Sequence, residues 1–214
     1  MLEPTQLTIP LVGAEEREPV LVNLGSGPSE DLSLPDYFKN WKHLRVDVDP
    51  AVEPDVLADL TDLSPIPDGH ADAVWASHCL EHLYEHEVMT ALNEFRRIVR
   101  DDGFVCIIVP DLQSVANYVA ADRMHEPIYD SPAGPVTPHD IFFGFGTAIA
   151  SGRISMAHKC GFTPSVLQRY FERMNFGEVL LRRREESLEL VGIARVIPPA
   201  DEPGRAGLFE SLGL

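Results

Sequence analysis

Cysteine is scarce in this 214-residue sequence, and long apolar runs are missing. The three cysteines, Cys79, Cys106 and Cys160, form no Cys-x-x-Cys pair, and an odd number cannot all pair within one chain. This pattern predicts free thiols and a cytoplasmic location. No basic segment followed by an apolar stretch opens the sequence, so no signal peptide is expected. No apolar run approaches the roughly 20 residues needed to cross a bilayer.

Positive charge is the second deficit. Lysine and arginine together number 17, against 34 aspartates and glutamates, which gives a formal net charge of −17. A negative field of this size repels phosphate backbones and anionic membrane surfaces. The sequence therefore predicts a small molecule as the partner, with no nucleic acid and no membrane. A role in solubility alone would explain the negative charge equally well. The oligomeric state is left open.

Apolar strand patterns alternate with helical patterns over most of the chain. Val88, Leu92, Phe95 and Val99 recur at helical spacing and predict a helix that is ended by residues 101–103. The expected strands lie at 20–24, 44–48, 55–58, 71–76 and 104–109, with a hairpin of 178–184 and 188–196 at the sheet edge. Further helices are expected at 34–41 with Ser33 as the cap, at 112–121 and at 164–174.

This alternation predicts an α/β fold with three layers, in which a doubly wound and mostly parallel seven-stranded sheet lies between helices. We expect an N-terminal arm over residues 1–18, one domain over 19–197 and a peripheral C-terminal tail over 198–214. Residues 125–163 are rich in proline and glycine and predict a long irregular loop. Long loops in α/β proteins tend to be functional, so we expect this lid segment, residues 125–163, to cover a ligand.

One strand ends in two glycines. The apolar run 20–24 is followed directly by Gly25-Ser26-Gly27. Glycine lacks a Cβ, so the backbone can turn sharply there and lie against a ligand. The carboxyl ends of parallel strands are also where open α/β sheets bind nucleotides. Two glycines alone are a weak signal, and Glu30 stands where the dinucleotide pattern requires a small residue, which argues against a nicotinamide cofactor.

An ordered set of short motifs indicates a more specific class of protein. They are Gly25-x-Gly27, Asp47 at the end of the second strand, Ala58-Asp59-Leu60, Asp72-Ala73-Val74, Leu80-Glu81-His82-Leu83 and Arg97-Ile98-Val99-Arg100-Asp101-Asp102-Gly103. Over residues 19–111 the sequence resembles the class I, Rossmann-like S-adenosylmethionine-dependent methyltransferases, and among them the small bacterial predicted methyltransferases that share the Leu-Glu-His-Leu segment. The resemblance implies an antiparallel strand at the sheet edge and a methyltransferase that uses S-adenosylmethionine and an unidentified small or medium-sized acceptor.

The resemblance also implies a set of cofactor-binding residues. The glycine turn would contact the methionine part, Asp47 the ribose hydroxyls and Asp59 the adenine amino group. The full expected set is Asn23, Gly25, Ser26, Gly27, Asp47, Val48, Asp59, Leu60, Ser77 and His78. The family usually has an acidic residue at the position of Asn23. The amide carries no negative charge, so two consequences are left open, namely weaker cofactor binding and loss of catalysis.

A general base is expected only if the acceptor is a hydroxyl or a carboxyl group. His139 and His158 in the lid segment and Asp111 at the end of the fifth strand are candidates because of their location. If the alanine variants of both histidines retained full turnover, this hypothesis would fail.

Two other functions are left open. A non-catalytic S-adenosylmethionine- or nucleoside-binding protein would show cofactor binding by calorimetry without methyl transfer. A zinc hydrolase would use the His78-x-x-Glu81-His82 segment, with His86 as a further histidine, if these residues shared one helix. His78 directly follows a strand, so the helix is expected to start later and no metal ligands are predicted. Metal analysis of the purified protein separates this alternative from the others.

Overall fold

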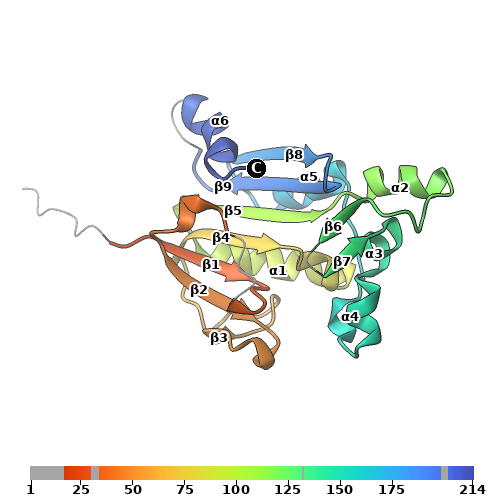
Figure 1. Cartoon of the computed structure of the whole chain (residues 1–214). Coiled ribbons are helices and arrows are strands. Elements are labelled where there is room, and N and C mark those ends of the chain that lie inside the picture. Colours follow the sequence, from red (N-terminus) through yellow and green to blue (C-terminus); the bar gives the residue numbers. More distant parts are fainter. Residues whose placement is uncertain (1–16, 30–33, 132, 199–201) are drawn as a thin grey trace, which may run out of the picture.

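A seven-stranded sheet forms the centre of the molecule, in the order β3-β2-β1-β4-β5-β9-β8 (Figure 1). The computed structural model describes residues 17–29, 34–131, 133–198 and 202–214. The strands are β1 (Val20–Leu24), β2 (Lys42–Asp47), β3 (Val56–Leu57), β4 (Ala71–Ser77), β5 (Val99–Pro110), β8 (Glu178–Arg184) and β9 (Glu189–Arg195). β9 runs antiparallel to both of its neighbours, and the remaining pairs are parallel. The predicted α/β fold with a mostly parallel sheet is confirmed.

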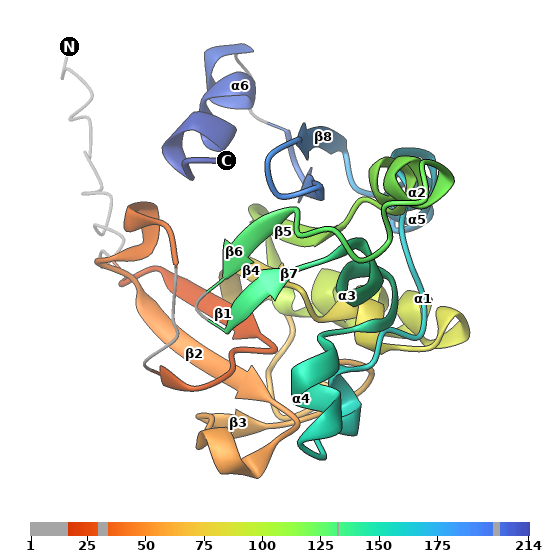
Figure 2. The same cartoon turned by 45° about the vertical axis from the view of Figure 1, so that its right-hand side comes forward.

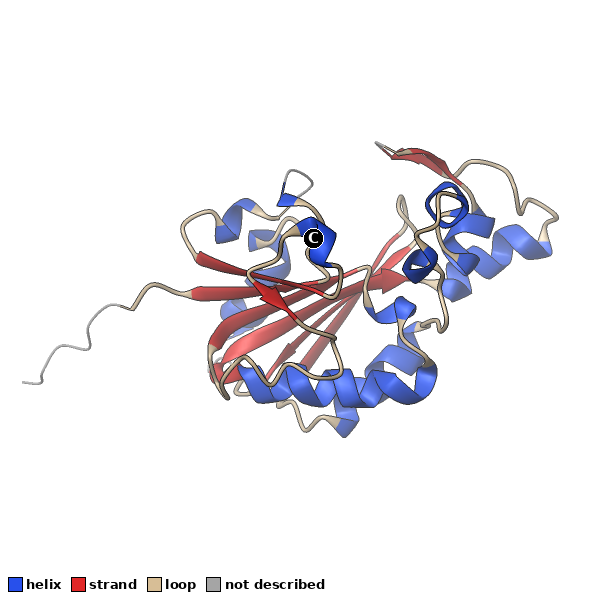
Figure 3. Cartoon of the chain, turned by 90° about the horizontal axis from the view of Figure 1, so that it is seen from below, coloured by secondary structure: helices blue, strands red, loops and turns tan. Residues whose placement is uncertain are grey.

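Helices cover both faces of the sheet, as Figure 3 shows. On one face α1 (Glu85–Ile98) and α5 (Pro164–Arg173) bury Phe95 and Phe171 against strand residues such as Val74. On the other face the short 3-10 helix η2 (Asp36–Phe38) and α6 (Glu202–Ser211) pack against Trp75 and its neighbours. Alternate strand residues enter the two cores because successive side chains of a strand point to opposite faces.

The lid segment lies beyond the carboxyl ends of the parallel strands (Figures 1 and 2). Its elements are β6 (Tyr129–Ser131), β7 (Gly134–Val136), α3 (Pro138–Phe143), α4 (Gly146–Ala150) and η5 (Ile154–Met156). The chain reaches this segment through α2 (Leu112–Ala120). β6 and β7 form a separate antiparallel ribbon, and the apolar side chains beneath them form a cluster distinct from the two main cores.

Four predictions of local structure were wrong. The lid segment is not irregular, because it contains a ribbon and short helices. Residues 34–41 form only the single turn η2, and Ser33 lies outside the described residues, as do residues 1–16 of the predicted arm.

Residues 101–103 do not end a helix. They lie inside β5, where a Cβ on Gly103 would approach the carbonyl oxygen of Asp72 to 2.6 Å. The tail is not peripheral, because Leu208 and Phe209 are buried on the sheet.

No helix in the part of the chain that the structure describes has the length and apolar character needed to span a membrane.

Candidate functional site

The glycine turn after β1 is fixed against the end of β2. Gly25 and Gly27 have φ values of +62° and +61°, a region that side chains disfavour. Ser26 N–H donates to the carbonyl oxygen of Val46 (3.1 Å), and Gly27 N–H donates to Oδ2 of Asp47 (2.9 Å). The turn and the Asp47 carboxylate, which the sequence places twenty positions apart, therefore meet at one edge of the sheet.

Asp47 is held from both sides. Its Oδ1 accepts the backbone N–H of Asp49 (2.9 Å) while Oδ2 accepts that of Gly27. Arg45 supports the same region, because its guanidinium donates to the carbonyl oxygens of Gly27 (2.7 Å) and Val52 (2.8 Å). A carboxylate offers about four lone-pair positions, so Asp47 keeps acceptor capacity for a ligand after these two bonds.

The neighbouring strand ends present apolar side chains to solvent. Val48 follows Asp47 and is 59% exposed, and Leu57, which pairs with Asp47 in the parallel register, is 58% exposed. Asn23 is buried within β1, two residues before Gly25. Leu57 was not singled out from the sequence, because an isolated leucine in a two-residue strand carries no pattern.

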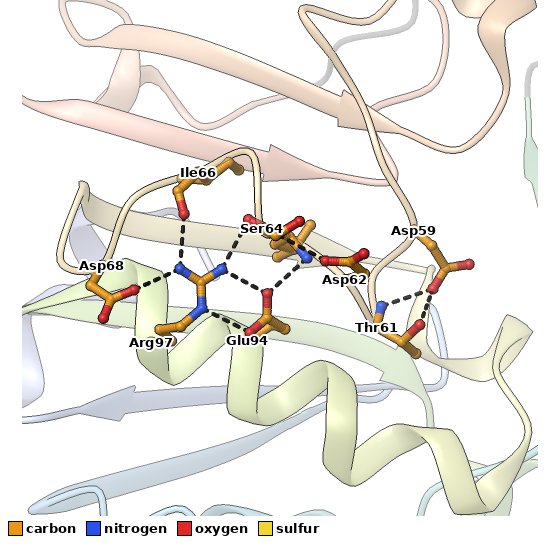
Figure 4. Close-up of polar contacts among 9 residues, drawn as sticks. Asp59, Thr61, Asp62, Ser64, Ile66, Asp68, Glu94 and Arg97 are labelled. Atoms are coloured by element: carbon orange, nitrogen blue, oxygen red, sulfur yellow. Dashed lines mark hydrogen bonds and ion pairs between the residues drawn. The ribbon is translucent and has the colours of Figure 1, made fainter.

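Asp59 begins a loop that is tied to α1 (Figure 4). One oxygen of Asp59 accepts both the backbone N–H (2.8 Å) and the hydroxyl (2.6 Å) of Thr61, and the side chain is exposed at the end of β3. Leu60, the next residue, is half-buried. Asp59 and Asp47 thus lie at the carboxyl ends of two paired strands, where the sequence predicted them.

Ser77 ends β4, and His78 follows it in a left-handed conformation (φ +51°). His78 lies between two carboxylates, with Nδ1 3.2 Å from Oε1 of Glu81 and Nε2 2.7 Å from Oε1 of Glu189. Partial removal from water opposes protonation of the imidazole, which stays 42% exposed, but the hydrogen bonds to Glu189 and Glu81 outweigh it and raise the pKa of His78 to about 10. His78 is therefore cationic at neutral pH and joins the first residue of β9 to the end of β4.

A cavity of about 170 Å³ lies between this edge of the sheet and the lid segment. Its wall includes Tyr129, Asp140, Met156 and His158 from the lid segment and Glu189 from β9. Burial lowers the pKa of His158, so its imidazole is neutral near pH 7. Of the three base candidates, His158 lines this cavity.

The other two base candidates are placed differently. Asp111 is fully buried and caps α2, where its carboxylate accepts from Gln113 N–H (3.1 Å) and Ser114 Oγ (2.6 Å) and pairs with Arg183 (2.8 Å). His139 stacks on His125 with ring centroids 5.2 Å apart. Neither residue is part of the cavity wall described above.

The zinc-hydrolase segment does not form one helix. His78 precedes the 3-10 turn η4 (Leu80–His82), and α1 begins only at Glu85. His86 stacks on Tyr84, with ring centroids 5.8 Å apart. The set of His78, Glu81, His82 and His86 is therefore not arranged as that motif requires.

Residues 22–107 match a family model described as a methyltransferase domain. No curated protein sequence matches the chain.

Solved structures share the fold. A SAM-dependent methyltransferase from Archaeoglobus fulgidus is similar with a TM-score of 0.53 and 16% identity, over 83% of this chain and 86% of the other. The 1,6-didemethyltoxoflavin-N1-methyltransferase of Burkholderia thailandensis, solved with bound 1,6-didemethyltoxoflavin and S-adenosylhomocysteine, has a TM-score of 0.51 and 18% identity, over 84% of this chain and 71% of the other. A Haloferax volcanii methyltransferase in complex with the Trm112 activator gives 0.55 and 11% over 87% and 86%.

The sheet order and these structural similarities show the Rossmann-like fold of class I methyltransferases. The similarity to the methyltransferase domain model lies within residues 22–107, and the similarity of the whole chain to these enzymes is one of fold.

Proposed function

We propose that this chain is an S-adenosylmethionine-dependent methyltransferase that acts on a small or medium-sized acceptor. The observation that carries the proposal is the hydrogen bond of 2.9 Å between Gly27 N–H and the Asp47 carboxylate. This bond places the backbone turn beside the Asp47 carboxylate at the carboxyl ends of β1 and β2. An adenosyl ligand needs both, the turn for close approach and the carboxylate to accept hydrogen bonds.

Each predicted cofactor residue has a role in this proposal. The free acceptor positions of Asp47 would take the ribose hydroxyls. The exposed side chains of Val48 and Leu57 offer an apolar surface for the adenine ring, next to Asp59 and Leu60. The methionine part would lie along Asn23 and Gly25-Ser26-Gly27, and Ser77 and His78 would lie on the side where the acceptor enters.

Methyl transfer depends on positioning of the two reactants and needs no covalent intermediate with the protein. The sulfonium already makes the methyl carbon electrophilic, so the protein has to align an acceptor atom with the carbon–sulfur bond and exclude water. The cavity under the lid segment would partly enclose the acceptor, and its volume of about 170 Å³ suits a small molecule. If the acceptor must lose a proton, His158 is the base candidate that its position favours.

Calorimetry with S-adenosylhomocysteine tests the proposal. We expect binding by the wild type and about 10-fold or weaker binding by Asp47→Asn, because one hydrogen bond between charged and neutral partners contributes roughly 1.5–3 kcal/mol. Asp102→Asn is the matched control, since Asp102 is exposed at the opposite end of the sheet. No heat of binding, or equal affinity of the Asp47 variant, would contradict the proposal.

Turnover is tested separately with methyl-labelled S-adenosylmethionine and a panel of phenols, amines and carboxylic acids. Transfer of label to one of these classes supports the enzyme. Binding of S-adenosylhomocysteine without transfer to any of them favours the non-catalytic binding protein.

A further inference from the structure

Three side chains from two separate parts of the chain converge at the cavity. Glu81 and His82 belong to η4, after β4, and His158 comes from the lid segment. One potential ligand atom from each residue lies within 4.8 Å of the others. The rings of His82 and His158 meet edge to face, with centroids 4.9 Å apart.

Both imidazoles are oriented in the way that metal-binding histidines are. Nδ1 of His158 lies 2.8 Å from the carbonyl oxygen of Ile141, and Nδ1 of His82 lies 3.2 Å from that of Ala157. A carbonyl oxygen can only accept, so Nδ1 carries the hydrogen and Nε2 keeps its lone pair. Backbone carbonyls commonly fix the tautomer and the ring orientation of histidine ligands in this manner.

Glu81 supplies an independent observation. Its side chain is 1% exposed, and its Oε1 contacts His78. Its Oε2 is buried and has no hydrogen-bond partner among the described residues. A buried carboxylate oxygen without a partner is destabilising, and a cation would satisfy it.

We propose that Glu81, His82 and His158 bind one divalent first-row transition-metal ion. Two imidazole nitrogens and one carboxylate oxygen suit Zn²⁺, Mn²⁺, Fe²⁺ and Co²⁺. Three protein ligands leave one or more coordination positions open, and all three residues line the cavity. This ligand set differs from the zinc motif in the sequence, because it replaces His78 and His86 with His158, 76 positions after His82.

The site also suggests the class of acceptor, and this part rests on the proposed methyltransferase function. An open coordination position in the cavity would take an oxygen donor, such as a hydroxyl or a carboxylate. A bound cation lowers the pKa of a coordinated hydroxyl, so the acceptor would release its proton to solvent before the methyl group is transferred. His158 would then be a metal ligand and would not fill the role of base considered under the proposed function.

Metal binding is tested without reference to methyl transfer. The protein is stripped with a chelator and titrated with Co²⁺ while visible absorption is recorded, and with Zn²⁺ and Mn²⁺ by calorimetry. We expect about one ion per chain, and affinity at least about 10-fold lower in both Glu81→Gln and His158→Ala, since even indirect disturbance of a metal site has an effect of this size. Far-ultraviolet circular dichroism confirms that the variants fold.

Glu85→Gln and His86→Ala are the matched controls. They change the same residue types in the first turn of α1, where both side chains are exposed, and should bind Co²⁺ like the wild type. Because the ion would join the lid segment to the end of β4, Co²⁺ should also slow trypsin cleavage after Arg153. The proposal is overturned if the wild type binds no ion, or if the Glu81 and His158 variants bind as tightly as the controls. Ion binding without S-adenosylhomocysteine binding would leave the metal site standing and remove the methyltransferase function.

Discussion

Glu94 and Arg97 lie one turn apart on α1 and together hold the loop that follows Asp59 (Figure 4). Arg97 donates to the carbonyl oxygens of Leu63 (2.9 Å) and Ile66 (2.8 Å), and Glu94 accepts the backbone N–H of Leu63 (2.7 Å). Two charged side chains thus satisfy several backbone groups of a loop that has no regular structure.

Arg97→Ala should therefore lower the free energy of unfolding by about 2 kcal/mol, because backbone carbonyls lose a charged donor. Arg96→Ala is the control and should have a smaller effect, less than about 1 kcal/mol, because Arg96 makes only a 3.5 Å contact with exposed Asp101 and a contact of 6.0 Å with the Phe176 ring. Urea denaturation measures both.

Hydrogen bonds from Arg97 hold the pKa of Glu94 below its usual 4.5. The stabilising effect of Glu94 should therefore be complete above pH 4.5 and decline as the pH falls through the lowered pKa.

The two glycines of the turn should differ in their tolerance of alanine. Both need a positive φ, which disfavours alanine by roughly 1–2 kcal/mol. A Cβ on Gly25 would also lie 2.7 Å from Cβ of Cys79, whereas nothing lies within 4 Å of a Cβ on Gly27. Gly25→Ala should therefore be clearly the more destabilising variant in thermal unfolding. Equal melting temperatures would show that the turn can move away from Cys79.

Asp140 ties α3 to α4 inside the lid segment. Its carboxylate accepts from the N–H (3.0 Å) and hydroxyl (2.6 Å) of Thr137 and from Gly146 N–H (3.1 Å). Asp140→Ala should increase hydrogen exchange of the amides of residues 137–150 by about 10-fold, the equivalent of roughly 1.4 kcal/mol for a lost helix cap. Asp130→Ala, at an exposed position of β6, should leave exchange there unchanged.

The same bonds give Asp140 a defined pH dependence. Burial acts in the opposite direction, but the hydrogen bonds from Thr137 and Gly146 lower the pKa of Asp140 below 3.8. The charged form therefore stabilises the lid segment above pH 3.8, and this contribution is lost as the pH falls through the lowered pKa. The exchange difference between wild type and Asp140→Ala should shrink over that range. A difference that is constant with pH would contradict the assignment.

The three cysteines should be poorly reactive in the folded protein. Burial raises the pKa of Cys79 and Cys106 well above the usual range and raises that of Cys160 to about 12. Thiols of this kind stay protonated at pH 8, and the thiolate is the reactive form. A disulfide reagent should modify buried Cys79 and Cys106 only after unfolding in guanidinium, whereas half-buried Cys160 should react slowly in the folded protein. Rapid modification of Cys106 in the native state would contradict this prediction.

Local patterns predicted the sheet well. The strands around Val22, Val74 and Ile107 have continuous apolar sequences because both faces of a central parallel strand are buried. The hairpin of β8 and β9 was also predicted close to its observed bounds. The secondary structure inside the lid segment was missed because its helices are as short as five residues and its ribbon strands have three, which is too short for a periodic signal.

The site could be predicted only where it follows the strand order. The positions of Gly27, Asp47 and Asp59 depend on parallel pairing of neighbouring strands, so they could be placed from the sequence. Glu189 and His158 reach the cavity through the antiparallel β9 and through the folded lid segment, and no local spacing indicates either contact. Their partners, His78 and Glu81, were noticed in the sequence, but for a helical motif that the structure does not contain.

The separate apolar cluster of the lid segment has a consequence for how such proteins can diversify. Val136 and Ile141 pack mainly with each other and with Val115 and Leu188, away from the cores that hold the strands together. Under the proposed function, substitutions there can reshape the wall that an acceptor would meet while the glycine turn and Asp47 stay as they are. A different acceptor preference could therefore be selected by replacing this one segment, with the rest of the chain inherited intact.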